Sequence, residues 1–427
     1  MEILLMWYRK ISFVHSNKYQ CLAILFLAIL ASCKTAQQTY QATSYPFPDP
    51  VDTETKPISL QDKQIFNHSD FELYARNDFP GARLNDFTKL NDSTFQVTIS
   101  AENEPINPSP WYAFKLWSRS TKNFYVRLHY VDARHRYPPK LSPDGSMWED
   151  LDSMKVATVD STDVVMNLSV GPDTLWVAGQ EIMNSLQVKA WAEELATHPE
   201  VEFQSIGSSK LGRPLYAIDI GPKRKRKKET IVLLSRQHPP EVTGFMALQS
   251  FLDKILDSSA QSNQFRSRYR ILVFPLMNPD GVDLGHWRHN AGGIDLNRDW
   301  QHYHQPETKQ VADYLVTQTR RNKSQVILGL DFHSTYYDVY YTNTLDSASV
   351  LPNFTKQWLQ RIGETIPDYE INERPSGVGK PVSKGWFYTQ FNAVGVTYEI
   401  GDKTPRDFIR LKGAVSAEKM MEVLLEE

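Results

Sequence analysis

From residue 215 to the C-terminus, apolar runs of strand length alternate with segments whose apolar residues have helical spacing. The strand-like runs are residues 215–220, 231–234, 269–275, 326–332 and 395–400. The helical segments are residues 242–256, 307–319, 354–362 and a closing stretch from about 405. This alternation predicts an α/β domain with a mixed central sheet flanked by helices. Binding and catalytic residues in such a sheet gather at the carboxyl ends of its strands.

The preceding segment has a different pattern, in which short runs alternate apolar and polar residues. Residues 94–99 and 124–130 are examples, and turn signals such as residues 142–145 separate the runs. Several short strands at this spacing predict an all-β sandwich. A chain of 427 residues is also too long for one ordinary core. We therefore expect a β-sandwich domain over residues 67–178 and the α/β domain over residues 179–427.

The first 33 residues have the order of a processing segment. Positive charge at Arg9 and Lys10 precedes the apolar run 21–30, which is too short to span a bilayer. Small residues then precede Cys33 and resemble the lipobox of bacterial lipoproteins, in which the cysteine is acylated. We expect residues 1–33 to be a lipoprotein signal peptide. The exported protein would be held at a membrane through lipidated Cys33, on the periplasmic face or at the cell surface. An ordinary secretory signal and a buried apolar helix are the alternatives.

Two polar stretches carry no sign of a catalytic site. Residues 34–66 are rich in proline with few periodic apolar positions, which predicts a flexible tether. Residues 223–228 are six consecutive cations, which we interpret as a solvated hairpin tip because charge runs are usually exposed. Contact with anionic lipid, peptidoglycan or nucleic acid is the alternative. The net charge of −3 supplies no field that would recruit nucleic acid, so we expect no nucleic-acid partner.

A His-Pro-Pro-Glu sequence, with His238 and Glu241 at its ends, follows one apolar run and precedes a helical pattern. A histidine nitrogen and a carboxylate in such a strand-to-helix turn can bind one metal ion. Catalytic zinc usually has three protein ligands and an open position for water. His333 ends a later apolar strand and completes a His₂Glu set for one zinc ion per chain. A satisfied structural histidine is the alternative for His333.

Five further residues have side chains suited to hydrolysis at such a site. Asp295 can accept a hydrogen bond from the far nitrogen of the first histidine and so fix its tautomer. Glu399 ends an apolar strand, where a carboxylate is costly without a role, and we expect it to serve as general base and later proton donor. Arg288 is a permanent cation suited to a developing oxyanion. Asn297 and Arg298 can bind a terminal carboxylate through an amide and a bidentate fork.

Each of these assignments has a structural alternative. Asp295 would then be an ordinary loop residue, and Glu399 would be a member of a buried ion pair with an arginine. Asn297 would cap a helix, and Arg298 would lie on the surface.

In this order the motifs resemble those of the zinc carboxypeptidases of the carboxypeptidase A superfamily, from about residue 206 to the C-terminus. The motifs are Gly207-x-Ser209-x-x-Gly212-Arg213, His238-x-x-Glu241, Asn278-Pro279-Asp280-Gly281, Trp287-Arg288, Asp295-x-Asn297-Arg298, His333-Ser334 and Thr397-Tyr398-Glu399. The resemblance implies the same zinc ligands and the same roles for the two arginines, the asparagine and the last glutamate. The β-rich segment looks like the N-terminal domain of the cytosolic carboxypeptidase branch, which includes enzymes that remove glutamates.

Two positions depart from the pancreatic-type enzymes of this family. A mobile tyrosine closes over their substrate, whereas the corresponding position here is Gly377, with no tyrosine beside it. The floor of their specificity pocket corresponds to Lys384. A lysine there predicts a preference for acidic C-terminal side chains, because an unpaired buried charge is costly. A Lys384 that points to solvent is the alternative.

The sequence therefore predicts an exported, lipid-anchored zinc carboxypeptidase. It would hydrolyse the C-terminal bond of a peptide or peptidoglycan peptide by Glu-assisted attack of zinc-bound water. A zinc amidase that acts on cell-wall peptides or N-acyl amino acids would use the same arginines and is one alternative. A non-catalytic protein that binds peptide or glycan, with a relic α/β domain, is the other. Such a relic should not retain zinc.

Overall fold

The computed structural model describes residues 38–221 and 229–427. Cys33 with the predicted signal peptide and the cation run 223–228 lie outside the described residues. The segment Gln41–Glu427 forms one compact unit. Within the described ranges, no helix combines the length and the apolar character needed to cross a membrane.

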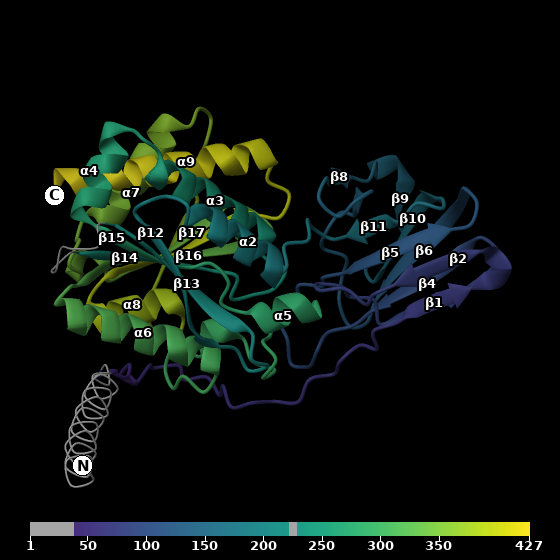
Figure 1. The fold of residues 1–427 in the computed structure, drawn as a ribbon, viewed down its shortest axis with the longest axis horizontal. Coiled ribbons are helices and arrows are strands. Elements are labelled where there is room, and N and C mark those ends of the chain that lie inside the picture. The colour runs from purple at the N-terminus through teal and green to yellow at the C-terminus, as the bar shows by residue number, and fades with distance from the viewer. Residues whose placement is uncertain (1–37, 222–228) are drawn as a thin grey trace, which may run out of the picture. The chain divides into compact units, whose positions relative to one another are not determined.

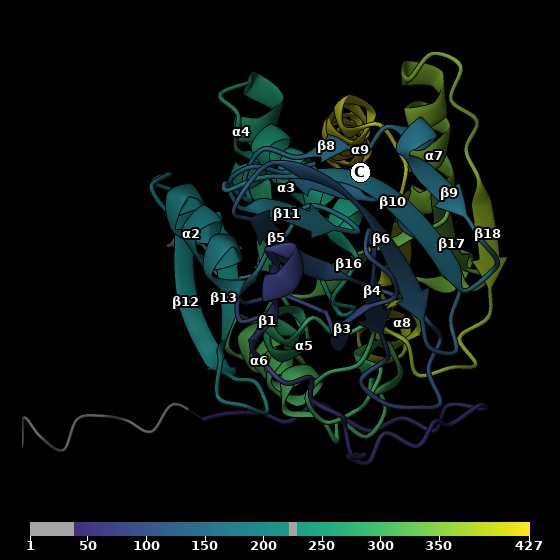
Figure 2. The same ribbon diagram turned by 90° about the vertical axis from the view of Figure 1, so that its right-hand side faces the viewer.

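Residues 65–178 form two β-sheets that pack face to face (Figure 1; Figure 2). The strands are β1 (Ile65–His68), β2 (Leu73–Arg76), β3 (Asp86–Lys89), β4 (Thr94–Ile99), β5 (Ala113–Ser118), β6 (Lys122–Tyr130), β7 (Lys140–Ser142), β8 (Glu149–Asp150), β9 (Val156–Thr158), β10 (Asp163–Val170) and β11 (Leu175–Ala178). One sheet has the order β1-β2-β5-β11-β7-β8 and the other β3-β4-β6-β10-β9. Every second residue of β4 is buried, and these side chains share one hydrophobic core with Leu116 and Val177 of the opposite sheet. Alternation along the strands thus produces the core between two sheets.

A mixed eight-stranded sheet forms the centre of the second domain, in the order β12-β13-β15-β14-β16-β19-β17-β18. Its strands are β12 (Val201–Ser208), β13 (Pro214–Ile220), β14 (Thr230–Ser235), β15 (Arg270–Phe274), β16 (Val326–Thr335), β17 (Val339–Asn343), β18 (Glu373–Ser376) and β19 (Val394–Gly401). Neighbours among β15, β14, β16 and β19 are parallel, whereas β13 and β17 pair antiparallel with the edges of this group.

Helices cover both faces of this sheet (Figure 1). The α-helices are α2 (Ser185–Leu195), α3 (Val242–Leu256), α4 (Ala260–Arg268), α5 (Pro279–Leu284), α6 (Pro306–Asn322), α7 (Phe354–Thr365), α8 (Ser383–Phe391) and α9 (Arg406–Glu426). Short 3-10 helices are η1 (Ser69–Phe71), η2 (Ser153–Lys155), η3 (Leu296–Arg298) and η4 (Asp346–Ala348). In β14, Ile231 and Leu233 share a core with α3, α7 and α9, while Val232 and Leu234 share a core with α6 and α8. The predicted fold class, an all-β region before a mixed sheet flanked by helices, is confirmed.

Residues 42–59 have no regular secondary structure; most of the segment contacts the α/β domain, and the Ser59 N–H donates to the Glu102 carbonyl of the β sandwich. Phe47 is buried, and Thr53 is buried with its hydroxyl donating to Asp299 at 2.5 Å. The composition of residues 34–66 predicted a flexible tether, and over residues 42–59 the structure instead shows fixed contacts. Backbone hydrogen bonds and a few buried side chains can hold such a segment without any periodic apolar pattern.

Candidate metal centre

Neighbouring strands in the parallel part of the sheet bring the predicted ligands together. His238 and Glu241 lie in the turn between β14 and α3, and His333 lies near the end of β16, which pairs with β14. Glu399 on β19 is the register partner of His333. Because the carboxyl ends of parallel strands meet at one edge of a sheet, four residues from three segments of the sequence converge there.

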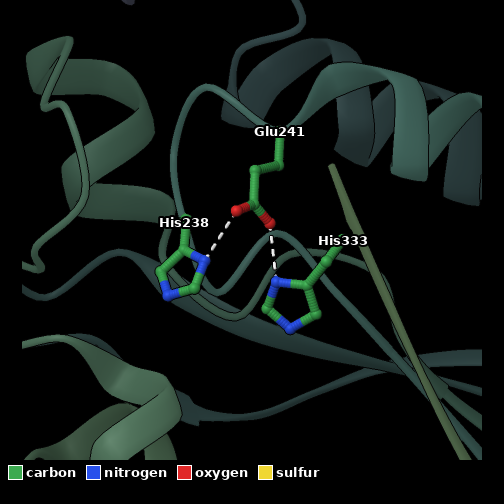
Figure 3. Close-up of side chains that lie close together, drawn as sticks. All are labelled: His238, Glu241 and His333. Atoms are coloured by element: carbon green, nitrogen blue, oxygen red, sulfur yellow. Dashed lines mark hydrogen bonds and ion pairs between the residues drawn. The ribbon is translucent and has the colours of Figure 1, made fainter. Parts of the chain in front are cut away.

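The Glu241 carboxylate lies between the two histidine rings (Figure 3). Its oxygens are 2.8 Å from His238 Nδ1 and 2.6 Å from His333 Nδ1. One ligand atom from each of the three residues can be chosen so that all lie within 4.8 Å of one another. Two imidazole nitrogens and one carboxylate oxygen at this spacing fit a zinc ion with its fourth position open.

Each histidine ring is held at its other nitrogen by an aspartate. His238 Nε2 lies 2.8 Å from Asp295 Oδ1, and His333 Nε2 lies 2.8 Å from Asp331 Oδ2. Both rings can therefore keep the proton on Nε2 and present a bare Nδ1 to a metal ion. The structure places Asp295 where the sequence predicted it, but the sequence analysis missed Asp331. A signal was available, because Asp331 and His333 are two positions apart on one strand and so share a face.

Local contacts fix the turn that carries the first two ligands. Arg236 has a φ of 56°, a left-handed conformation that is strained for a residue with a side chain. Its guanidinium donates to the Pro239 carbonyl at 2.6 Å, and this hydrogen bond between two residues of the turn stabilises its conformation. Gly244, in the first turn of α3, lies so close to β16 that a Cβ would overlap the His333 carbonyl. The helix after the turn and the strand of the third ligand are thus in direct backbone contact.

Glu399 extends toward the same edge of the sheet, and its Oε2 atom is buried without a hydrogen-bond partner among the described residues. Burial raises the pKa of the Glu399 carboxyl above its usual value, and the positive charges of His333 and Arg288 only partly offset this. A buried polar atom without a partner is rare in native proteins and needs an explanation. A substrate or water bound in the cavity would supply the partner.

The other predicted substrate-binding residues line the same cavity as His238, Glu241 and His333. Arg288 Nε donates to Asp295 Oδ2 at 2.8 Å, and the Arg288 side chain lines the cavity. Arg298 Nη1 donates to the Asn297 carbonyl at 2.7 Å. Asn297 Oδ1 accepts from the Ser383 backbone N–H at 2.9 Å, and its Nδ2 lies 3.3 Å from His333 Nε2.

This cavity has a volume of about 770 Å³ and extends from the metal centre to Lys384. Lys384 lies in the first turn of α8 and is 4% exposed, so it does not point to solvent. Its ammonium donates to Asn343 Oδ1 at 2.7 Å and to the carbonyls of Thr342 and Ser376 at 3.2 and 3.3 Å. All three acceptors are neutral. Burial lowers the pKa of Lys384 to about 8, and the more distant charge of Asp346 opposes this shift.

Other residues of the cavity were not predicted from the sequence. Arg136, from the β sandwich, lines it and is paired with Asp402 at 2.8 Å, with its guanidinium 4.6 Å from the ring centre of Tyr336. No sequence signal marks Arg136, because its position depends on how two domains pack. Gly377, at the position of the family's mobile tyrosine, also lines the cavity. Tyr336 and Tyr341 bring hydroxyl-bearing side chains into the same wall from other elements.

Comparisons with known proteins extend these observations. A family model described as zinc carboxypeptidase matches residues 188–413. Cytosolic carboxypeptidase 2 of Xenopus tropicalis is 34% identical over 113 residues, which are 25% of this chain and 11% of that protein. An uncharacterized protein of Zymomonas mobilis is 24% identical over 230 residues, 51% of this chain and 59% of that protein. The chain therefore covers less than two thirds of the length of each of these relatives.

Solved structures resemble the chain over both domains. A metallo-carboxypeptidase from Burkholderia cenocepacia has a TM-score of 0.70 and 17% identity, and the match covers 83% of this chain and 99% of that one. A metallo-carboxypeptidase from Pseudomonas aeruginosa, solved with (2-guanidinoethylmercapto)succinic acid, has a TM-score of 0.66 and 16% identity over 82% of this chain. At these identities the likeness concerns the fold.

Proposed function

Because this chain belongs to the zinc carboxypeptidase family, we propose that it is a hydrolase that releases C-terminal residues from peptides, with one zinc ion held by His238, Glu241 and His333. One observation carries the proposal. A single cavity joins the three ligands to the partnerless Oε2 of Glu399 and to cationic side chains. An open metal position, a carboxylate beside it and cations farther along are the groups needed to cleave a peptide next to its terminal carboxylate.

The chain's own residues have separate tasks in this scheme. When bound, zinc would supply Lewis acidity at its open position, which makes water a better nucleophile near neutral pH. Glu399 would accept a proton from that water and return it to the leaving amine. Its raised pKa suits both tasks, because a carboxyl that titrates closer to neutral pH can accept and release a proton more readily.

Three residues would orient the substrate. Arg288 is held by Asp295, which also holds His238, so the arginine and the first zinc ligand share one anchor. From there Arg288 would stabilise negative charge on the carbonyl oxygen of the scissile bond. The Asn297 Nδ2 group and the Arg298 guanidinium would bind the terminal carboxylate.

Lys384 supports a preference for acidic terminal residues. Its ammonium has only neutral acceptors in contact, so a substrate carboxylate would be its first anionic partner. A terminal Lys or Arg side chain would instead bring a second cation into the same pocket, which costs binding energy. The Pseudomonas aeruginosa relative was solved with a succinic acid derivative, and such a dicarboxylate is a suitable binding probe here.

We further propose that Cys33 is acylated and holds the exported protein at a membrane. The order of positive charge, apolar run and small residues before Cys33 supports this. Substrates would then be exported peptides or the peptides of peptidoglycan. Radiolabelled palmitate should be incorporated into the full-length chain in bacterial cells and not into Cys33→Ala, and equal labelling of both would contradict the proposal.

A direct assay tests the proposed activity. The purified protein is incubated with matched peptides that end in Glu, Lys or Phe, with and without a zinc chelator, and products are identified by mass spectrometry. We expect stepwise loss of the terminal residue, fastest from the Glu peptide, abolished by chelator and restored by zinc. No chelator-sensitive release from any peptide would overturn the carboxypeptidase, and release of diaminopimelate from muropeptides alone would favour a cell-wall amidase.

A further inference from the structure

We propose that Glu102, in the β sandwich, is a positioning residue that holds Arg288 at the active site. The proposal rests on the function proposed above, in which Arg288 acts on the scissile carbonyl. Glu102 follows β4, and Arg288 lies in the loop after α5 of the other domain. The structure connects the two residues through backbone hydrogen bonds, and it connects Arg288 onward to a zinc ligand.

The Glu102 carboxylate accepts three consecutive backbone N–H groups of this loop. Its Oε2 accepts from Trp287 at 2.8 Å, and its Oε1 accepts from Arg288 at 3.0 Å and from His289 at 2.6 Å. Glu102 is fully buried, so water cannot replace it as the acceptor. Burial opposes ionisation of Glu102, but nearby His286 and Arg83 and these N–H groups outweigh it and lower its pKa. The backbone N–H groups of the loop therefore donate to an ionised carboxylate.

The side chains on either side of Arg288 are also held by the β sandwich. Trp287 is buried within the sandwich core, and its indole N–H donates to the Trp111 carbonyl at 3.2 Å. His289 Nδ1 lies 2.6 Å from Asn103 Oδ1. Backbone and neighbouring side chains thus leave the loop little freedom, and the Arg288 side chain alone extends toward the cavity.

From Arg288 the connection continues to the metal centre. Its Nε donates to Asp295 Oδ2, and Asp295 Oδ1 accepts from His238 Nε2, both at 2.8 Å. A shift of the loop backbone would therefore move the guanidinium away from the substrate carbonyl and loosen the aspartate that orients His238. Catalysis depends steeply on such placement, because a displacement of about 1 Å can cost about 100-fold in rate.

Glu102→Gln is the informative variant, because it keeps the shape and one carbonyl oxygen while it removes the charge and one acceptor. We expect kcat on the Glu-ended peptide to fall about tenfold, with KM within about twofold, zinc content unchanged and only a modest loss of thermal stability. Glu104→Gln, an exposed position two residues away, is the matched control and should retain full kcat. An unchanged kcat in Glu102→Gln would overturn the proposal.

A double-mutant cycle separates positioning from general support of the fold. Arg288→Ala should lose about 100- to 1000-fold in kcat. If Glu102 acts through Arg288, adding Glu102→Gln to Arg288→Ala should cause no further loss. A further tenfold loss in the double variant would show that Glu102 acts by another route and would contradict the proposal.

Hydrogen exchange supplies a readout that does not require activity. Amides 287–289 should exchange slowly in the native protein and at least about tenfold faster in Glu102→Gln, while amides of the sheet core stay unchanged. If no peptide is cleaved by the native protein, the proposed function fails, yet this comparison still tests the contact. Equal exchange of amides 287–289 in both proteins would remove the basis for Glu102 as a positioning residue.

Discussion

Asp295 and Asp331 play equivalent parts in the geometry of the two histidines that we propose as zinc ligands. Each accepts from the Nε2 of one ring, so both rings present Nδ1 toward Glu241. The sequence could predict Asp295 because it lies within a motif, and it could have predicted Asp331 from strand alternation. The sequence could not predict that Nδ1, rather than Nε2, faces the proposed metal position in both His238 and His333. The choice of nitrogen depends on how each imidazole ring is rotated.

Glu399→Gln should separate binding of zinc from chemistry. The amide keeps the shape of the side chain but cannot accept a proton, so we expect kcat to fall by about 1000-fold. Zinc content should stay near that of the native protein, because Glu399 is outside the proposed ligand set. Kinetics and metal analysis on one preparation check this, and a variant that retains more than a tenth of kcat would exclude Glu399 as the base.

Lys384 predicts a pH dependence that only acidic substrates share. Its pKa is lowered to about 8 in the folded protein, so the ammonium is charged below that pH and neutral above it. As pH rises from about 7 to about 9, kcat/KM for Glu-ended peptides should fall relative to Phe-ended peptides, because kcat/KM reports ionisation of the free enzyme. Parallel pH profiles for the two peptides would argue against a role for Lys384.

Substitution tests the same residue at constant pH. Lys384→Met should reduce the preference for Glu over Phe by roughly tenfold, equivalent to about 1.4 kcal/mol. Lys380→Met is the matched control, because Lys380 also lines the cavity but is exposed. If both variants lose the preference equally, the general positive charge of the cavity is responsible rather than Lys384.

The helices and strands differ in how well periodicity predicts them. The strand predicted at 326–332 corresponds to β16, and the helix predicted at 354–362 corresponds to α7. Helix α8 was not predicted, because it is nine residues long and its apolar pair Phe387 and Phe391, four positions apart, covers little more than one turn. Contacts with the sheet, rather than its own pattern, place α8.

Two glycines make this placement possible. Gly329 of β16 and Gly395 of β19 are register partners, and neither places a side chain between the sheet and α8. A Cβ on Gly329 would overlap the Phe387 ring, and a Cβ on Gly395 would overlap the Lys384 carbonyl. The close approach of α8 to the sheet is what brings Lys384 into the wall of the cavity.

Gly395→Ala should therefore displace the start of α8. We expect the free energy of unfolding to fall by roughly 1–3 kcal/mol, as for other overpacked sites, and the preference for Glu-ended peptides to weaken. Gly377→Ala is the matched control, since a Cβ there has no neighbour within 4 Å. Urea unfolding of both variants checks the prediction, and equal stability of Gly395→Ala and the native protein would contradict it.

At the scale of the whole molecule, the two domains contribute to one site. The sequence predicts a β sandwich before an α/β domain, but it contains no sign that Arg136 lines the cavity of the candidate metal centre or that Trp287 enters the sandwich core. Contacts between residues more than 100 positions apart depend on the packed fold and leave no local pattern. The same holds for residues 42–59, because their composition does not reveal their contacts with the two domains.

The central claim is that His238, Glu241 and His333 hold one catalytic zinc ion. Crystals of the purified protein, measured on both sides of the zinc absorption edge, test it most directly. We predict one anomalous peak per chain, about 2.0–2.2 Å from both Nδ1 atoms and from a Glu241 oxygen. His333→Ala should lack the peak under the same conditions. No zinc signal in the native crystals, or a zinc ion bound elsewhere while this cluster stays free, would contradict the account.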